Sequence, residues 1–178
     1  SIEIDNKIDA ENFLKFRREQ IKMYPKSFQN EEEYFDEPEK IDLDSENEKL
    51  RKIGENESYI CQLIRNDSIK EFIIYITKNN LSLSSHIKPS YFETNSILNR
   101  RKPTLIEYAA FYGSIQIFQY LRLNEIELTD SLWSYAIHSN NAELIHILEE
   151  FNGLHSKKIL NICLKESIKC HHNAIFNY

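Results

Sequence analysis

The chain has 178 residues, a formal net charge of −6 and a pI near 5.6. This length suits one domain or a few small stacked units, and the acidity argues against nucleic-acid binding, because phosphates need a contiguous basic surface. The longest apolar runs, such as FIIYI at 72–76, are far shorter than the roughly 20 residues that cross a bilayer. We expect Cys61, Cys163 and Cys170 to be free thiols in a reducing compartment, because their spacing fits neither a disulfide framework nor a zinc ribbon.

The N-terminal part of the chain combines one helical pattern with one acidic run. Apolar residues at steps of mostly three or four predict an amphipathic helix over 9–24, which Pro25 ends. Ten acidic residues against Lys40 alone predict an extended or mobile connector from Glu31 to Glu48. Such a connector is either a solvated linker or a segment that docks on a basic partner.

A short third helix is expected at the end of this acidic run. Ser45 and Glu48 have the spacing of a capping box, so the helix should begin there and run to Ile53. Gly54 can then take the left-handed conformation that ends many helices. These signals separate an N-terminal segment, 1–54, from the remainder, 55–178.

From about residue 58 the sequence consists of short apolar runs separated by polar pairs, and this pattern repeats along the chain. Each repeat reads as an apolar helix, a polar turn and a second apolar helix. Aligning the repeats places Leu63, Ala109, Ala136 and Ser167 at one position, with spacings of 46, 27 and 31 residues. Neither helix of a pair can bury its apolar face alone, so neighbouring pairs should stack. The repeats are expected near residues 58–80, 104–124, 131–151 and 157–178, the last one truncated.

The turn inside each repeat is marked by its residue types. Gly113 lies at the point where the chain reverses, and Asp67 and Asn140, which align with it, also tolerate positive φ. His171, at the fourth equivalent place, is a poorer turn former. The small residues Ala109 and Ala110 should let a first helix approach its neighbour closely.

Two capping boxes and one insert complete the pattern. Thr104 with Glu107, and Ser68 with Glu71, have the S/T-x-x-E spacing that marks helix starts. The longest spacing leaves an insert at 81–102, in which SYFETNSIL is expected to make an extra short helix.

The run TLIEYAAFYG, 104–113, resembles the first helix and turn of the ankyrin repeat, with Leu105 and Glu107 where that motif has Pro and His. ETN, LIEYAAFYGSIQIFQYLRLN, ELTDSLWSYAIHSNNAELIHILEE and ESIKCHHN are together similar to an uncharacterised ankyrin-like family, a domain of unknown function expanded in a parasitic flagellated protist. The resemblance covers about residues 55–178. It implies an all-α, ankyrin-like helical-hairpin solenoid, although the uneven spacings predict irregular or missing hairpin fingers.

The resemblance also implies where partners bind. Ankyrin-like stacks bind proteins through the first helices and loops, at the exposed places that follow the small-residue pair. Aromatic and arginine side chains at such places suit protein recognition. Carried over by position, these places are Arg65, Asn66, Phe111, Tyr112, His138 and Ser139. The alternative is that Phe111 and Tyr112 pack on the insert or on the N-terminal segment.

A second hypothesis uses the cysteines and histidines near the C-terminus. Cys163, Cys170, His171 and His172 could hold a metal or a small ligand and so make a regulator. Adjacent histidines, however, lie about 100° apart on a helix and do not readily share one metal ion. The helical spacing of the two cysteines equally fits a packed face.

No catalytic motif is present. The chain has no glycine-rich phosphate loop, no G-x-S-x-G and no H-E-x-x-H, and His138 and His146 lack an obvious nucleophile. Trp133 aligns with Ile106 and is expected in the core. We therefore expect a non-enzymatic protein-interaction module without cofactors, an adaptor or a structural component of a larger assembly, in the cytoplasm or associated with the cytoskeleton. In such an assembly the N-terminal helix and its acidic connector could clamp a neighbouring subunit.

Overall fold

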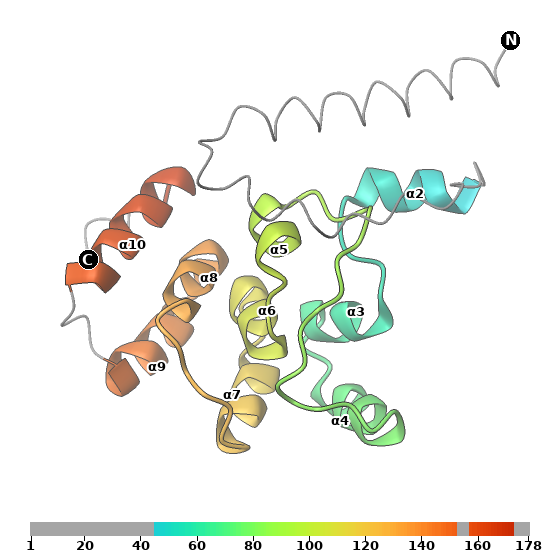
Figure 1. Cartoon of the computed structure of the whole chain (residues 1–178), viewed down its shortest axis with the longest axis horizontal. Coiled ribbons are helices and arrows are strands. Elements are labelled where there is room, and N and C mark those ends of the chain that lie inside the picture. The colour runs from blue at the N-terminus through green and yellow to red at the C-terminus, as the bar shows by residue number, and fades with distance from the viewer. Residues whose placement is uncertain (1–44, 153–156, 173–178) are drawn as a thin grey trace, which may run out of the picture. The chain divides into compact units, whose positions relative to one another are not determined.

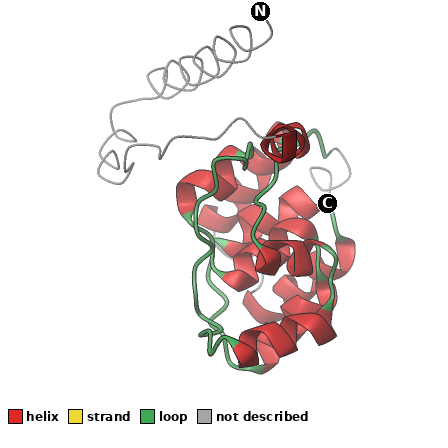
Figure 2. Ribbon diagram, turned by 90° about the vertical axis from the view of Figure 1, so that its right-hand side faces the viewer, coloured by secondary structure: helices red, strands yellow, loops and turns green. Residues whose placement is uncertain are grey.

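A computed structural model describes residues 45–152 and 157–172. The predicted helix over 9–24, the acidic connector up to residue 44 and the last six residues of the fourth repeat lie outside this description. The chain divides into two units, Ser1–Leu43 and Asp44–Tyr178, and everything described here belongs to the second. Its described residues form helices and no strand, which confirms the all-α prediction (Figures 1 and 2).

Helix α2 (Ser45–Ile53) has the predicted extent. It ends at Gly54, whose φ of +70° is the left-handed conformation expected there, and whose N–H donates to the carbonyl of Leu50 at 3.0 Å. Although the sequence grouped this helix with the N-terminal segment, it belongs to the second unit of the structure.

Helix pairs follow in the predicted order. Their bounds are α3 (Tyr59–Arg65) with α4 (Ile69–Lys78), α6 (Leu105–Tyr112) with α7 (Ile115–Leu123), and α8 (Leu132–Ser139) with α9 (Ala142–Asn152). Helix α10 (Lys157–Lys169) comes last. The first helices contact one another in chain order, α3 on α6, α6 on α8 and α8 on α10, while α4 contacts α7 (Figure 1). Consecutive pairs therefore lie next to one another in space.

All four turn positions adopt the left-handed conformation. The φ angles are +48° at Asp67, +69° at Gly113, +52° at Asn140 and +56° at His171. In the first of these turns the N–H of Asp67 donates to the carbonyl three residues back, and the next N–H donates five residues back, as in a Schellman motif; the turns at Gly113 and His171 repeat this. The predicted equivalence of the four positions is therefore confirmed for the backbone.

The insert contains the extra helix expected from its sequence, α5 (Ser96–Arg101). It begins late in SYFETNSIL because Asn95 caps it, accepting from the N–H of Ile97 at 3.0 Å. Just before it, buried Glu93 accepts from the N–H groups of Asn56 at 3.2 Å and Asn95 at 2.8 Å. The residues ETN thus fasten the insert to the segment that precedes α3. Within the described residues the insert has no hairpin finger, only an isolated bridge between His86 and Thr104.

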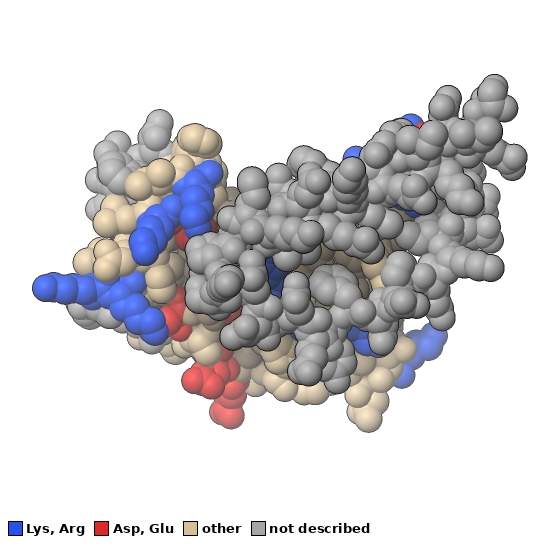
Figure 3. All heavy atoms as spheres, turned by 45° about the horizontal axis from the view of Figure 1, so that its top comes forward, with Lys and Arg blue, Asp and Glu red and all other residues tan. Residues whose placement is uncertain are grey.

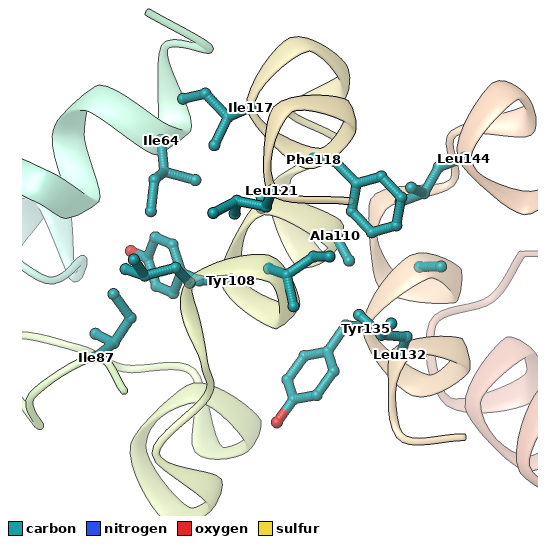
Figure 4. Packing of buried hydrophobic residues seen from close by; sticks show 14 of the residues in the cluster. Ile64, Ile87, Tyr108, Ala110, Ile117, Phe118, Leu121, Leu132, Tyr135 and Leu144 are labelled. Atoms are coloured by element: carbon teal, nitrogen blue, oxygen red, sulfur yellow. The ribbon is translucent and has the colours of Figure 1, made fainter. Parts of the chain in front are cut away.

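The core lies between the helix pairs. Figure 4 shows side chains from several helices meeting there, among them Tyr108, Phe118 and Leu144. Trp133 is 2% exposed, which confirms its predicted core position, and the small residues Ala109 and Ala110 are fully buried. Dense packing of this kind holds the pairs in register.

Of the three predicted capping boxes, the two at Thr104 and Ser68 have different outcomes. Thr104 and Glu107 form a complete box at the start of α6, as expected. The box at Ser68 is wrong, because this side chain makes no capping hydrogen bond. Ser68 has ψ of 72°, whereas Thr104 has the extended ψ of 167° that aims the side chain at the first turn.

Consecutive pairs are also joined by hydrogen bonds at the turns. The carboxylate of Asp67 accepts from the backbone N–H groups of Gln116 and Ile117, both at 3.0 Å, and so caps α7 from the preceding pair. Ser114 occupies the N-cap position of α7, but its hydroxyl donates instead to the carbonyl of Ile64 at 2.5 Å. This exchange of caps makes the stacking of the first two pairs specific.

A candidate protein-binding row at the helix turns

Four of the six predicted binding residues lie in a continuous row, which we call the turn-edge row. It consists of Arg65, Tyr112, Phe111 and His138, from the last turns of α3, α6 and α8. Arg65, Phe111 and His138 occupy aligned positions of successive repeats, so stacking the pairs brings them together. The row therefore follows from the repeat itself.

Arg65 is the most firmly held member. Its Nη1 donates to the carbonyl of Asn56 and to the hydroxyl of Tyr108, both at 2.9 Å, and its Nε lies 2.9 Å from a carboxylate oxygen of Glu55. Its guanidinium carbon lies 5.8 Å from the centre of the Tyr112 ring, within the range of a cation–π contact. These contacts fix the planar group before any partner arrives.

The aromatic members of the row contact one another. The centre of the Tyr112 ring lies 4.9 Å from that of Tyr108 and 5.1 Å from that of Phe111. Phe111 in turn stacks on His138, with ring centres 5.1 Å apart and planes 25° from parallel. Burial raises the pKa of Tyr112 to about 12, so its hydroxyl stays neutral and can donate a hydrogen bond.

At the far end of the row, His138 bridges α8 and α10. Its Nε2 lies 3.3 Å from a carboxylate oxygen of Glu166, and its Nδ1 lies 3.3 Å from the sulfur of Cys170. Burial lowers the pKa of His138 and raises that of the Cys170 thiol, so both groups are neutral near pH 7. With its proton on Nε2, the imidazole donates to Glu166 and accepts from the thiol.

Cys170, His138 and Glu166 are arranged in the order of a nucleophilic triad, but their pKa shifts are opposite to those that a triad requires. A nucleophilic cysteine needs a thiolate, which a neighbouring imidazolium favours. Here the pKa of Cys170 lies above its usual value and that of His138 below it, so the proton stays on sulfur. The arrangement is a chain of neutral hydrogen bonds onto a carboxylate.

The remaining two predicted residues lie beside the row. Asn66 is exposed, whereas the hydroxyl of Ser139 is engaged within its own turn, donating to the carbonyl of Ala136 at 2.7 Å. The expectation that all six places are exposed is wrong, because five are partly buried. The rings of Phe111 and Tyr112 contact one another and pack against the buried core, and the carboxylate of Glu93 in the insert acts on the Tyr112 hydroxyl.

The residues of the metal hypothesis are distributed around α10. In the described parts of the chain, no group of three or more His, Cys, Asp or Glu is placed to hold a metal ion. Cys163 has its pKa raised to about 11 by burial, which disfavours the thiolate that metals bind. His171 is exposed at the left-handed turn. Sequence reasoning had grouped these residues by their proximity along the chain.

A broad groove of about 1300 Å³ is lined by residues of 125–131, the start of α6 and Ile159 of α10. Its lining includes Arg101, Glu107 and Asp130 together with Ile126 and Leu128. Small-molecule sites enclose most of their ligand in a predominantly apolar pocket, and this wide, mixed surface lacks that character. The groove therefore gives the small-ligand hypothesis no specific support.

Comparison with known proteins gives no further guide to this site. No protein-family model matches the chain, and neither a curated protein nor a solved structure matches it. None of the helices in 45–152 and 157–172 has both the length and the apolar character needed to cross a membrane.

Proposed function

We propose that the chain is a non-enzymatic protein–protein interaction module, an adaptor or a structural component of a larger assembly, built as an ankyrin-like helical solenoid. The support for the solenoid is the repetition of one turn geometry at Asp67, Gly113, Asn140 and His171, together with first helices that contact in chain order. A quasi-one-dimensional stack presents an extended side surface, which is how repeat proteins bind partners.

The turn-edge row is the observation that carries the proposal. Arginine and aromatic side chains dominate the energetics of protein interfaces, especially where they are already partly desolvated. Arg65 and the rings of Tyr112 and Phe111 are fixed by their own contacts, so binding costs little side-chain entropy. A partner surface with carboxylate or amide groups and an apolar centre fits this row.

The protonation states of His138 and Cys170 support the non-enzymatic part of the proposal. Burial lowers the pKa of His138 and raises that of Cys170, which disfavours the thiolate that a cysteine nucleophile or a cysteine metal ligand requires. The three cysteines are free thiols, as suits a reducing compartment such as the cytoplasm, where we place this module.

The test is a comparison of partners captured by wild type and by Phe111→Ala. We expect proteins captured by wild type to be lost from Phe111→Ala, because removing the ring opens the centre of the row. Tyr91→Ala is the matched control, since Tyr91 is an exposed aromatic residue in the insert. Thermal unfolding first establishes that both variants fold. An identical set of captured partners for Phe111→Ala and wild type contradicts the assignment of the surface.

A further inference from the structure

Helix α10, the last of the described helices, has one face that no other described residue buries fully. Leu160, Leu164 and Ile168 are spaced four residues apart on α10 and are 42%, 42% and 59% exposed. The adjoining side of the helix, which includes Ile159 and Ser167, is buried. Three large aliphatic groups on one side of a helix form a continuous apolar strip, which we call the α10 outer strip.

The alignment of the repeats shows how deeply the equivalent positions are buried elsewhere. Ile168 aligns with Ile137, Ala110 and Ile64, which are each at most 1% exposed. Leu164 aligns with Trp133 and Ile106, both 2% exposed, and with Ile60, which is partly buried. Each of those earlier first helices has another first helix packed after it, whereas α10 stands at the end of the described row (Figure 1). Leu160 aligns with the exposed residues Thr129 and Lys102, so Leu164 and Ile168 are the members of the strip whose equivalents are buried.

The charge beside the strip is positive. Lys157 and Lys165 are exposed on α10, and Lys158 and Lys169 lie beside the strip in ion pairs with Asp130 at 3.4 Å and Glu166 at 2.8 Å. Figure 3 shows basic side chains gathered over this end of the molecule. The chain as a whole has a net charge of −6, so this apolar and basic face differs from its average surface. Two copies joined through α10 would oppose like charges, which disfavours a homodimer here.

We propose that the α10 outer strip binds an acidic amphipathic helix of another protein, which packs on α10 as α10 packs on α8. Apolar residues of that helix cover Leu160, Leu164 and Ile168, and its flanking carboxylates face the lysines. The strip shares no residue with the turn-edge row. A single helix buries less area than a standard interface, so the expected affinity is in the micromolar range.

The probe is a fluorescent synthetic helix of roughly 18 residues with leucines every third or fourth position and glutamates beside them. Its anisotropy is measured against the full chain. We expect saturable binding to wild type and at least roughly tenfold weaker binding to Leu164→Glu and to Ile168→Glu, because each places a carboxylate inside the apolar contact. Leu123→Glu is the matched control, since Leu123 is 76% exposed on α7. Lys165→Glu should weaken binding and reduce its dependence on salt.

Four outcomes overturn the proposal. One is no saturable binding of the acidic helix to wild type; another is equal loss of binding in Leu123→Glu. Equal binding of a peptide with lysine in place of glutamate shows that the partner is not acidic. Self-association of wild type in sedimentation, abolished by Leu164→Glu, identifies a second copy as the occupant. Unfolding followed by Trp133 fluorescence checks that each variant retains the wild-type fold.

Discussion

The clearest test of how the pairs are joined is Asp67→Asn. Asparagine has the same size and tolerates the left-handed conformation of this turn, so the backbone needs no rearrangement. Its amide oxygen can accept from only one of the two N–H groups that the carboxylate now serves, those of Gln116 and Ile117. The substitution therefore removes one hydrogen bond and the charge at the start of α7.

The expected cost follows from these contacts. A hydrogen bond to a charged acceptor contributes about 1.5–3 kcal/mol, and partial exposure of the N–H of Gln116 places this one at the lower end. Ser114 cannot replace the lost cap, because its hydroxyl is bound to the carbonyl of Ile64. We expect a loss of about 1–2 kcal/mol, which lowers the melting temperature by roughly 3–8 °C for a unit of this size.

Two probes measure the effect in different parts of the stack. Far-UV circular dichroism follows all helices, while the fluorescence of Trp133, the only tryptophan, follows α8. In a quasi-one-dimensional stack a weakened link lets one end unfold first, so circular dichroism should change at lower denaturant than fluorescence in Asp67→Asn. Glu127→Gln removes an exposed carboxylate from a loop and is the matched control. Unfolding of Asp67→Asn at the same midpoint as this control refutes the coupling role of the carboxylate.

Three further substitutions test the turns and the bridge to α10. Gly113→Ala should destabilise the chain by about 1–2 kcal/mol in thermal unfolding, because its φ is +69° and the new Cβ would lie 3.3 Å from the Asn141 amide nitrogen. His171→Gly, at the equivalent turn, should instead stabilise it by up to about 1 kcal/mol, because glycine adopts positive φ freely; destabilisation by both substitutions refutes the common turn geometry. Burial lowers the pKa of His138; for Glu166, burial alone would raise the pKa, but hydrogen bonds from Lys169 and His138 lower it. Because both pKa values are lower in the folded state, the unfolded state binds more protons as the pH falls. The two groups therefore contribute their full stabilisation above their unfolded pKa values, and this stabilisation is lost as the pH falls through the folded pKa values. In urea titrations between about pH 7 and pH 5, where histidine dominates, His138→Gln should lose less stability than wild type; parallel curves contradict this reasoning.

The order of the helix pairs was predictable because it depends on local signals. Apolar spacing, the turn residues and the box at Thr104 act within a few residues of one another, and the structure confirms the helices that they mark. Ser68 has the same S/T-x-x-E spacing and fails, because the preceding left-handed Asp67 holds it away from the extended conformation. A capping motif in a tight turn is thus a weaker signal than one after an extended segment.

The contacts of the row were only partly predictable. Phe111 and His138 align in adjacent repeats, so their stacking follows from the register. The hydrogen bond from Arg65 to Tyr108 joins residues 43 apart across the insert, and no periodic pattern marks it. The cap that Asp67 provides to α7 was also missed. The sequence marks Asp67 as a turn residue, and nothing in the pattern indicates that its carboxylate also binds the next pair.

The bend at 67, 113, 140 and 171 is made by an aspartate, a glycine, an asparagine and a histidine on nearly the same backbone. Because the bend is held by main-chain bonds, a mutation at such a place changes stability by small steps and leaves the path of the chain intact. At Asp67 the side chain is not needed for the bend itself, and its carboxylate instead caps a helix of the next pair.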